Sequence, residues 1–155
     1  MYKLLYTKGK PGKGEYCVII QRKGKIYKGI AHVHPEDQFS EIIGGSIAEN
    51  KCNLHYYEEM LKQKKEEIKG VEKFIQHCKQ CKNFDNESPT AKVMWRQYNV
   101  LLKEKEKIEK RIENIKLVIT NIGNARANFR ATQQKIINRR KALAELREKI
   151  LAKTE

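Results

Sequence analysis

The sequence has no long apolar run and no sign of export. No stretch approaches the about 20 consecutive apolar residues that a membrane-spanning helix needs, so we expect no membrane partner. The lysine-containing start lacks the apolar core of a signal peptide, which favours a cytoplasmic location. Without an export signal, the four cysteines are expected to be reduced rather than paired.

The residue patterns of common enzymes are also missing. No Ser/His/Asp or Cys/His arrangement stands out, and no pair of carboxylates is placed for acid-base chemistry. Residues 8–14 form a loop rich in glycine and lysine. A P-loop, however, needs Ser or Thr after its lysine, and here Glu15 and Tyr16 follow the last glycine. We therefore expect a protein that is not an enzyme and needs no cofactor.

A zinc site is a weak alternative. Cys78 and Cys81 have a metal-like spacing, but four ligands would also require Cys52 and His55. Two cysteines three positions apart on a helix face a core as readily as a metal. The sequence therefore predicts no bound metal.

The charge of the chain is strongly one-sided. Lys and Arg number 33 against 19 Asp and Glu, a formal net charge of +14, which favours nucleic acids, nucleotides or phosphorylated partners. Residues 1–35 carry eight basic groups against Glu15, and residues 114–155 carry ten against three. Residues 36–113 are balanced, with 15 of each sign. Two basic regions therefore flank a neutral one.

The sequence predicts an α+β protein that begins with a small three-stranded antiparallel sheet. Lys23-Gly24 joins two β-branched and aromatic runs as a hairpin turn. The three expected strands are Tyr2 to Thr7, Glu15 to Arg22 and Lys25 to Val33. A helix opening at Pro35 is expected to cover this sheet with Phe39, Ile42 and Ile43, completing a domain of residues 1–45.

A long antiparallel helical hairpin is expected over residues 46–155. Gly44-Gly45 interrupts the covering helix or lets a neighbouring backbone approach closely, and Ser46 to Glu49 forms a capping box for a new helix. That helix ends near Lys82, and Ser88 caps the next helix at Pro89. The apolar residues of the first helix repeat every seven positions: Ile47, Leu54, Leu61, Ile68 and Ile75.

The second helix carries the same repeat and is longer than its partner. Its seam consists of Leu101, Ile108, Ile115, Ile122, Phe129, Ile136, Leu143 and Ile150. Between Val118 and Leu146, the partner positions of the heptad turn polar or small: Ala125, Thr132 and Arg139. The expected lengths are about 54 Å and about 97 Å, so the second helix extends past the first.

Two arrangements would bury this excess length. The chain either folds back at Gly123-Asn124, or continues as one helix whose far half packs against a second copy. The heptad phase passes through Gly123-Asn124 without slipping, which favours the continuous helix and a homodimer or higher homo-oligomer. Gly followed by Asn is also a legitimate helix end, so both arrangements stay open here.

The basic part of the second helix is the predicted ligand site. From Asn114 to Ala144 there are seven basic residues and no acidic one. Helical spacing places Arg126, Arg130, Gln133 and Arg140 on one stripe with small neighbours, and the planar guanidinium suits phosphate. Phe129 stacks on a base or packs in the seam. The predicted ligand contacts are Arg126, Arg130, Phe129, Asn124, Gln133, Tyr98 and Arg140, although Tyr98 is also suited, with Trp95, to cover the hairpin end.

These features together resemble those of a known protein family. An N-terminal sheet, the stretch from His34-Pro35-Glu36-Asp37 through Ile42 to Glu49, and long helices with a basic, arginine-containing middle resemble small phage-encoded proteins. Among these, the chain is similar to the anti-Thoeris family, which sequesters cyclic ADP-ribose signals. The resemblance implies a dimer-based assembly in the host cytoplasm that binds cyclic ADP-ribose isomers or cyclic oligonucleotides without cleaving them, and so blocks antiphage defence. The Arg126/Arg130 pair matches a phosphate-clamping arginine pair by its spacing.

Two rival hypotheses come from the residues alone. A lysine-rich sheet face followed by a helix also resembles double-stranded-RNA-type nucleic-acid binders, in which Lys23, Lys25 and Lys28 would meet the phosphate backbone. In that case the hairpin serves only for dimerisation. The second rival is a coiled-coil inhibitor that binds a host protein directly, for which the sequence indicates no specific face.

Overall fold

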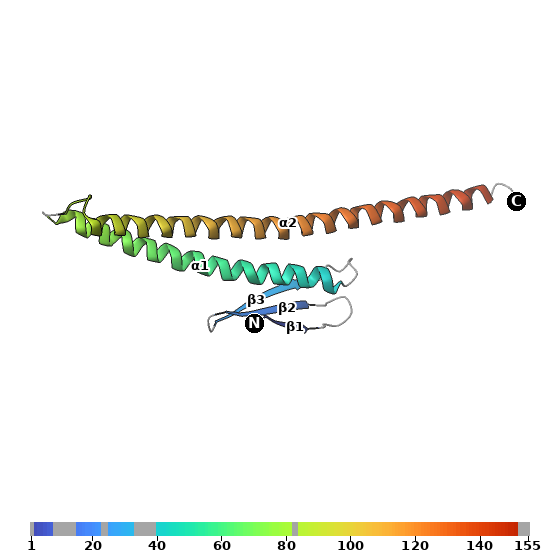
Figure 1. The fold of residues 1–155 in the computed structure, drawn as a ribbon. Coiled ribbons are helices and arrows are strands. Elements are labelled where there is room, and N and C mark those ends of the chain that lie inside the picture. The colour runs from blue at the N-terminus through green and yellow to red at the C-terminus, as the bar shows by residue number, and fades with distance from the viewer. Residues whose placement is uncertain (1, 8–14, 23–24, 33–39, 82–83, 152–155) are drawn as a thin grey trace.

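The protein is a small sheet attached to two long helices. The structure, a computed structural model, describes residues 2–7, 15–22, 25–32, 40–81 and 84–151. The elements, drawn in Figure 1, are β1 (Tyr2–Thr7), β2 (Glu15–Arg22), β3 (Lys25–His32), α1 (Glu41–Gln80) and α2 (Pro89–Leu151). The first two strands have the predicted bounds, whereas the third ends at His32, and its predicted last residue, Val33, lies outside the described residues. The strands pair antiparallel in the order β1-β2-β3.

Helix α1 is the middle layer of the molecule. One of its sides contacts β2 and β3, and another contacts α2 (Figure 1). At the crossing with β3 lies a small buried core of Ala31, Ala48 and Cys52, with Tyr27 and Ile47 packed against it. Small side chains at this crossing allow the helix backbone to come close to the sheet.

The covering helix and the first arm of the hairpin are one element. The sequence prediction of a break at Gly44-Gly45 and a new start at Ser46 is wrong, because α1 runs unbroken from Glu41. Ser40 is its N-cap, and the Ser40 hydroxyl accepts a hydrogen bond from the Ile43 amide at 3.4 Å. Two glycines cost a helix only about 1 kcal/mol each, and packing of α1 on β3 offsets that. The expected helix start at Pro35 lies outside the described residues, and the expected domain boundary after residue 45 falls inside α1.

The second helix is also continuous. Ser88 caps it as predicted, since its hydroxyl accepts a hydrogen bond from the Ala91 amide at 3.2 Å. Helix α2 then runs for 63 residues through Gly123-Asn124, so the chain does not fold back there. At 1.5 Å per residue, α2 is about 95 Å long, whereas the 40 residues of α1 span about 60 Å.

The helical hairpin predicted from the period of seven is confirmed, and its seam is buried only where α1 accompanies α2. Apart from Ala48 and Cys52 beneath the sheet, the buried hydrophobic side chains of the two helices are Ile68, Ile75, Ala91, Met94, Ile108, Ile112 and Ile115. Ile115 is the last buried residue of α2 in the part of the chain that the structure describes. Beyond Thr120, α2 projects past the sheet and α1 (Figure 1). We call residues 121–151 the arm.

No helix among the described residues is long and apolar enough to cross a membrane.

Candidate anion-binding surfaces

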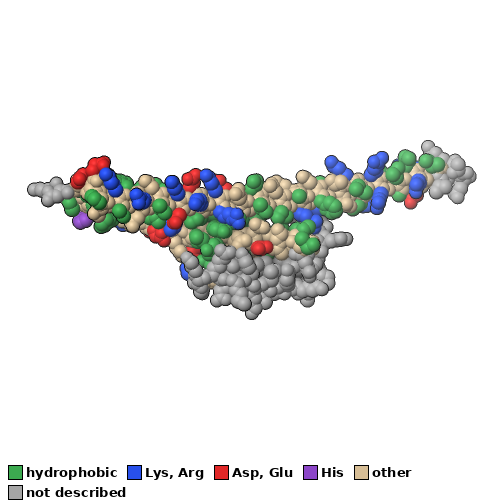
Figure 2. All heavy atoms as spheres, viewed as in Figure 1, with side chains coloured by type: hydrophobic (Ala, Val, Ile, Leu, Met, Phe, Trp, Pro, Cys, Tyr) green, Lys and Arg blue, Asp and Glu red, His purple; other side chains and the backbone are tan. Residues whose placement is uncertain are grey.

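The arm carries most of the residues predicted to contact a ligand. Arg126 and Arg130 are half-buried, whereas Asn124, Gln133 and Arg140 are exposed, and all five lie on α2. The arm holds eight basic residues against Glu145 and Glu148. Figure 2 shows Lys and Arg side chains distributed along the projecting end of the molecule. The predicted arginine stripe is therefore presented by one helix, open to solvent.

Phe129 lies in no core of the single chain. Its side chain is 53% exposed, and its ring centroid lies 5.8 Å from the guanidinium carbon of Arg126. Three further seam residues of the arm are similarly exposed, namely Ile136, Leu143 and Ile150, whereas Ile122 is half-buried. The apolar seam that is buried at Ile108 and Ile115 thus continues along the arm as an exposed stripe.

Tyr98 is separated from the other predicted ligand contacts. It precedes Arg126 by 28 residues on the same helix, which corresponds to about 42 Å. Its hydroxyl donates a hydrogen bond to Glu72 Oε1 at 2.8 Å, and this carboxylate raises the pKa of Tyr98. Its ring meets Trp95 edge-on, with the centroids 6.0 Å apart. Within one chain, Tyr98 covers the hairpin and does not reach the arginine stripe.

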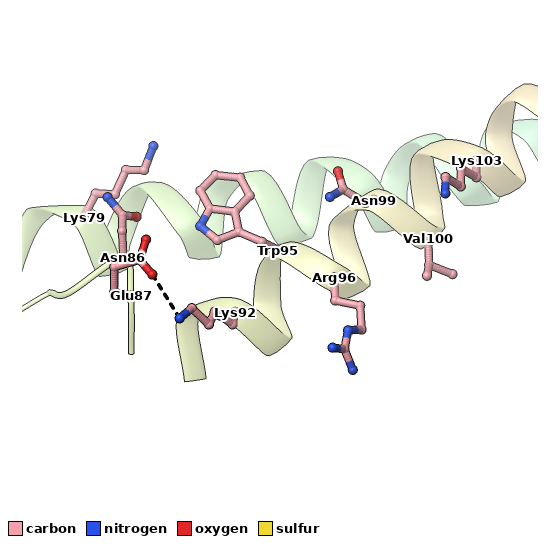
Figure 3. A pocket seen from close by; sticks show the side chains of 9 residues that line it. All are labelled: Lys79, Asn86, Glu87, Lys92, Trp95, Arg96, Asn99, Val100 and Lys103. Carbon is pink, nitrogen blue, oxygen red and sulfur yellow. Dashed lines mark ion pairs between the residues drawn. The ribbon is translucent and has the colours of Figure 1, made fainter. Parts of the chain in front are cut away.

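A hollow of about 730 Å³ lies beside Trp95 near the turn of the hairpin (Figure 3). Four cations line it, but they do not converge. Lys79 lies over the Trp95 ring at 5.2 Å, and Lys92 pairs with Glu87 at 2.9 Å. Figure 3 shows Trp95 and Asn99 projecting from one side of α2 and Arg96 from another. The arrangement favours packing of the hairpin end over binding of a single anion.

A second hollow, of about 690 Å³, lies where β3, α1 and α2 meet. We call it the cradle. Each of the three elements supplies a lysine and an apolar side chain to its lining, and α1 and α2 add one further polar residue each. The lining residues are Lys28 and Ile30 of β3, Lys51, Leu54 and His55 of α1, and Lys116, Ile119 and Thr120 of α2.

Two short hydrogen bonds hold the α1 wall of the cradle against β3. The Lys51 ammonium donates to the Ile30 carbonyl oxygen at 3.0 Å. His55 Nδ1 lies 3.0 Å from the Lys28 carbonyl oxygen, which can only accept, so Nδ1 carries the proton. Lys116 lies 3.9 Å from Glu58 Oε1. Sequence reasoning missed this cluster, because its lysines are far apart in the chain and each resembles an ordinary surface residue.

The two lysines of β3 both lie near α1. Lys25 donates a hydrogen bond to Glu59 of α1, and this contact lowers the pKa of Glu59 and raises that of Lys25. Lys28 lines the cradle. Lys23 lies outside the described residues. The two described lysines of the predicted nucleic-acid surface therefore lie beside the helix that covers the sheet.

The four residues of the zinc alternative are not brought together. Cys52 is buried against β3, whereas Cys78 is 26 residues further along α1, a distance of about 39 Å. Across residues 2–7, 15–22, 25–32, 40–81 and 84–151, the structure contains no group of three or more His, Cys, Asp or Glu residues that could hold a metal ion.

Comparisons of the chain with protein-family models, with curated proteins and with solved structures find no match.

Proposed function

We propose that this protein binds and sequesters a phosphorylated nucleotide-type ligand without converting it. The proposed ligands are those implied by the resemblance to the anti-Thoeris family, namely cyclic ADP-ribose isomers or cyclic oligonucleotides. Sequestering them would block an antiphage defence. The observation that carries this proposal is Arg126 and Arg130, one helical turn apart on an exposed arm beside a half-exposed Phe129. Guanidinium groups bind phosphate through two parallel hydrogen bonds, and an exposed ring is suited to stack on a base.

A second copy of the chain completes this site. The exposed stripe of the arm keeps the heptad phase of the seam that α1 covers earlier in α2. Two arms can pair antiparallel, with the centre of the pair near residue 134. In this register, each seam residue of one copy lies opposite the second apolar position of a heptad in the other copy. This register places Leu143 opposite Ala125, Ile136 opposite Thr132 and Phe129 opposite Arg139 of the second copy, while Ile150 meets Val118, just before the partner's arm.

The same register gathers the cations on one edge of the arm pair. Arg126 of one copy comes beside Arg140 of the second copy, and Gln133 comes beside Gln133 of the second copy. The segment from residue 114 to residue 144 itself contributes no acidic residue to this edge. The neighbouring guanidinium groups of the two copies carry like charges and repel each other, and a phosphate bound between them removes that repulsion. Ligand binding and self-association of the arm should therefore strengthen each other.

Calorimetry with cyclic ADP-ribose isomers and cyclic dinucleotides tests the proposal. Replacing Arg126 or Arg130 with Ala removes charge-assisted hydrogen bonds worth roughly 1.5–3 kcal/mol, so the affinity should fall about 10- to 150-fold. Arg96→Ala is the matched control, since Arg96 is an exposed arginine of α2 that lies outside the arm, about 45 Å from Arg126. The ligand should be recovered intact after denaturation of the complex. Unchanged affinity in both variants, or a cleaved ligand, contradicts the proposal.

Nucleic-acid binding is the second candidate, and the length of the arm favours it. The eight basic residues of the arm lie between Arg126 and Lys149, a span of about 35 Å, which matches about 10 base pairs of duplex at 3.4 Å each. This candidate uses the arm in place of the sheet. It predicts duplex binding that weakens steeply as salt rises and that Arg147→Ala reduces as much as Arg126→Ala, since phosphate contacts contribute similarly along the backbone.

A further inference from the structure

We propose that the cradle is a binding site for a nucleoside monophosphate, separate from the arginine stripe of the arm. The cradle brings Lys28, Lys51 and Lys116 from three elements to the wall of one hollow. Such convergence of ammonium groups from distant parts of a chain concentrates positive potential in a concave surface. An anion is the ligand that this potential favours.

The local carboxylates leave most of this charge uncompensated. Among the described residues, neither Lys28 nor Lys51 forms an ion pair, and Lys116 reaches only Glu58, at 3.9 Å. One of the three ammonium protons of Lys51 is used on the Ile30 carbonyl oxygen, which fixes the position of Nζ and leaves two donors. Lys51 is therefore positioned by the fold, and the three lysines keep donors for a phosphate.

The apolar part of the cradle defines the rest of the ligand. Ile30, Leu54 and Ile119 line the hollow between the cations. Inorganic phosphate would leave these side chains in contact with water, whereas a base or sugar would cover them. The volume of about 690 Å³ lies within the roughly 300–1,000 Å³ typical of small-molecule sites. A nucleoside carrying one phosphate fits both the charge and the size.

Two polar groups add directionality. Because Nδ1 of His55 is committed to the Lys28 carbonyl oxygen, Nε2 is the nitrogen that remains for a ligand. The Thr120 hydroxyl both donates and accepts, and it lines the same hollow from α2. A sugar hydroxyl or the edge of a base can form hydrogen bonds with this pair of groups while the phosphate meets the lysines.

The test is titration of the full chain with adenosine monophosphate and, in parallel, with inorganic phosphate. Calorimetry measures the affinity, and the NMR signal of the His55 ring reports whether the ligand reaches the cradle. The double variant Lys28→Gln/Lys116→Gln should weaken binding of the nucleotide at least tenfold. Lys107→Gln, an exposed lysine of α2 outside the cradle, is the matched control and should bind as the wild type does. Circular dichroism checks that each variant keeps its helices.

The titrations test the class of ligand and the position of the site separately. Inorganic phosphate that binds as tightly as the nucleotide overturns the assignment of ligand class. A nucleotide that leaves the His55 signal unchanged, or whose affinity the double variant retains, overturns the site. Arg126→Ala and Arg130→Ala should leave nucleotide binding at the cradle unchanged. The two proposed sites are therefore tested separately: the arginine variants test the arm, and the double lysine variant tests the cradle.

Discussion

Gly29 of β3 lies directly against the backbone of Ala48 of α1. A Cβ atom on residue 29 would lie 1.9 Å from the Ala48 carbonyl oxygen and 2.5 Å from the Cys52 amide nitrogen. Cys52 in turn donates from its Sγ to the Tyr27 carbonyl oxygen at 2.9 Å. The sheet and α1 therefore meet through their main chains, and this contact positions both walls of the cradle that they supply.

Gly29→Ala should destabilise the protein strongly, because a backbone atom cannot rotate away from the added methyl group. Overpacking typically costs about 1–3 kcal/mol, and we expect about 3 kcal/mol or more here. Urea denaturation followed by circular dichroism measures it. Gly45→Ala is the matched control, since nothing lies within 4 Å of a Cβ there, and it should stabilise α1 by about 0.5–1 kcal/mol. Equal effects of the two substitutions would contradict the contact.

The contact between Glu59 and Lys25 should make stability depend on pH. Hydrogen bonds from Lys25 and then Tyr27 lower the pKa of Glu59 in the folded protein. A carboxyl group with a lowered pKa stabilises the fold above its unfolded pKa of about 4.3, and this contribution is lost as the pH falls through the folded value. Thermal unfolding should show the loss below about pH 4. Glu59→Gln should remove this part of the pH dependence, and Lys25→Gln should reduce it. If the wild type, Glu59→Gln and Lys25→Gln show the same dependence of thermal stability on pH, the contact is contradicted.

Self-association through the arm should distinguish two adjacent isoleucines. Ile136 and Ile137 are 41% and 43% exposed, but only Ile136 occupies the heptad seam. Ile136→Asp should abolish association, because it introduces a charge into the apolar interface, whereas Ile137→Asp should leave association intact. Light scattering coupled to size exclusion measures the mass of each variant. Wild-type protein that stays monomeric at micromolar concentration would refute pairing of the arms in the absence of ligand.

The hairpin seam should be energetically uneven along α2. Ile115→Ala removes a side chain that is 7% exposed and should cost about 2–5 kcal/mol, since it leaves a cavity against α1. Leu117→Ala removes a side chain that is 58% exposed and should cost less than about 1 kcal/mol. Both are aliphatic residues of the same helix, two positions apart. Chemical denaturation measures the free energy of unfolding of each variant. If Ile115→Ala and Leu117→Ala lose similar amounts of stability, α1 does not cover the seam as described.

The period of seven and the start of α2 are local features, and the sequence was sufficient for them. Ser88 and Pro89 begin α2 as predicted, because a cap is formed by residues a few positions apart. The spacing of Arg126 and Arg130 likewise requires only that the segment be helical. Gly44-Gly45 shows the limit of such reasoning, since glycines that would end an isolated helix are tolerated where α1 packs on β3.

The cradle and the contact of Gly29 with Ala48 were decided by the tertiary structure alone. Lys28, Lys51 and Lys116 acquire a common function only when β3, α1 and α2 meet, and no spacing in the chain encodes that meeting. The sequence also placed Tyr98 with the arginines of the arm, but a continuous α2 keeps them about 42 Å apart. Helical periodicity fixes which residues share a face, whereas the packing of one element on another determines which faces meet.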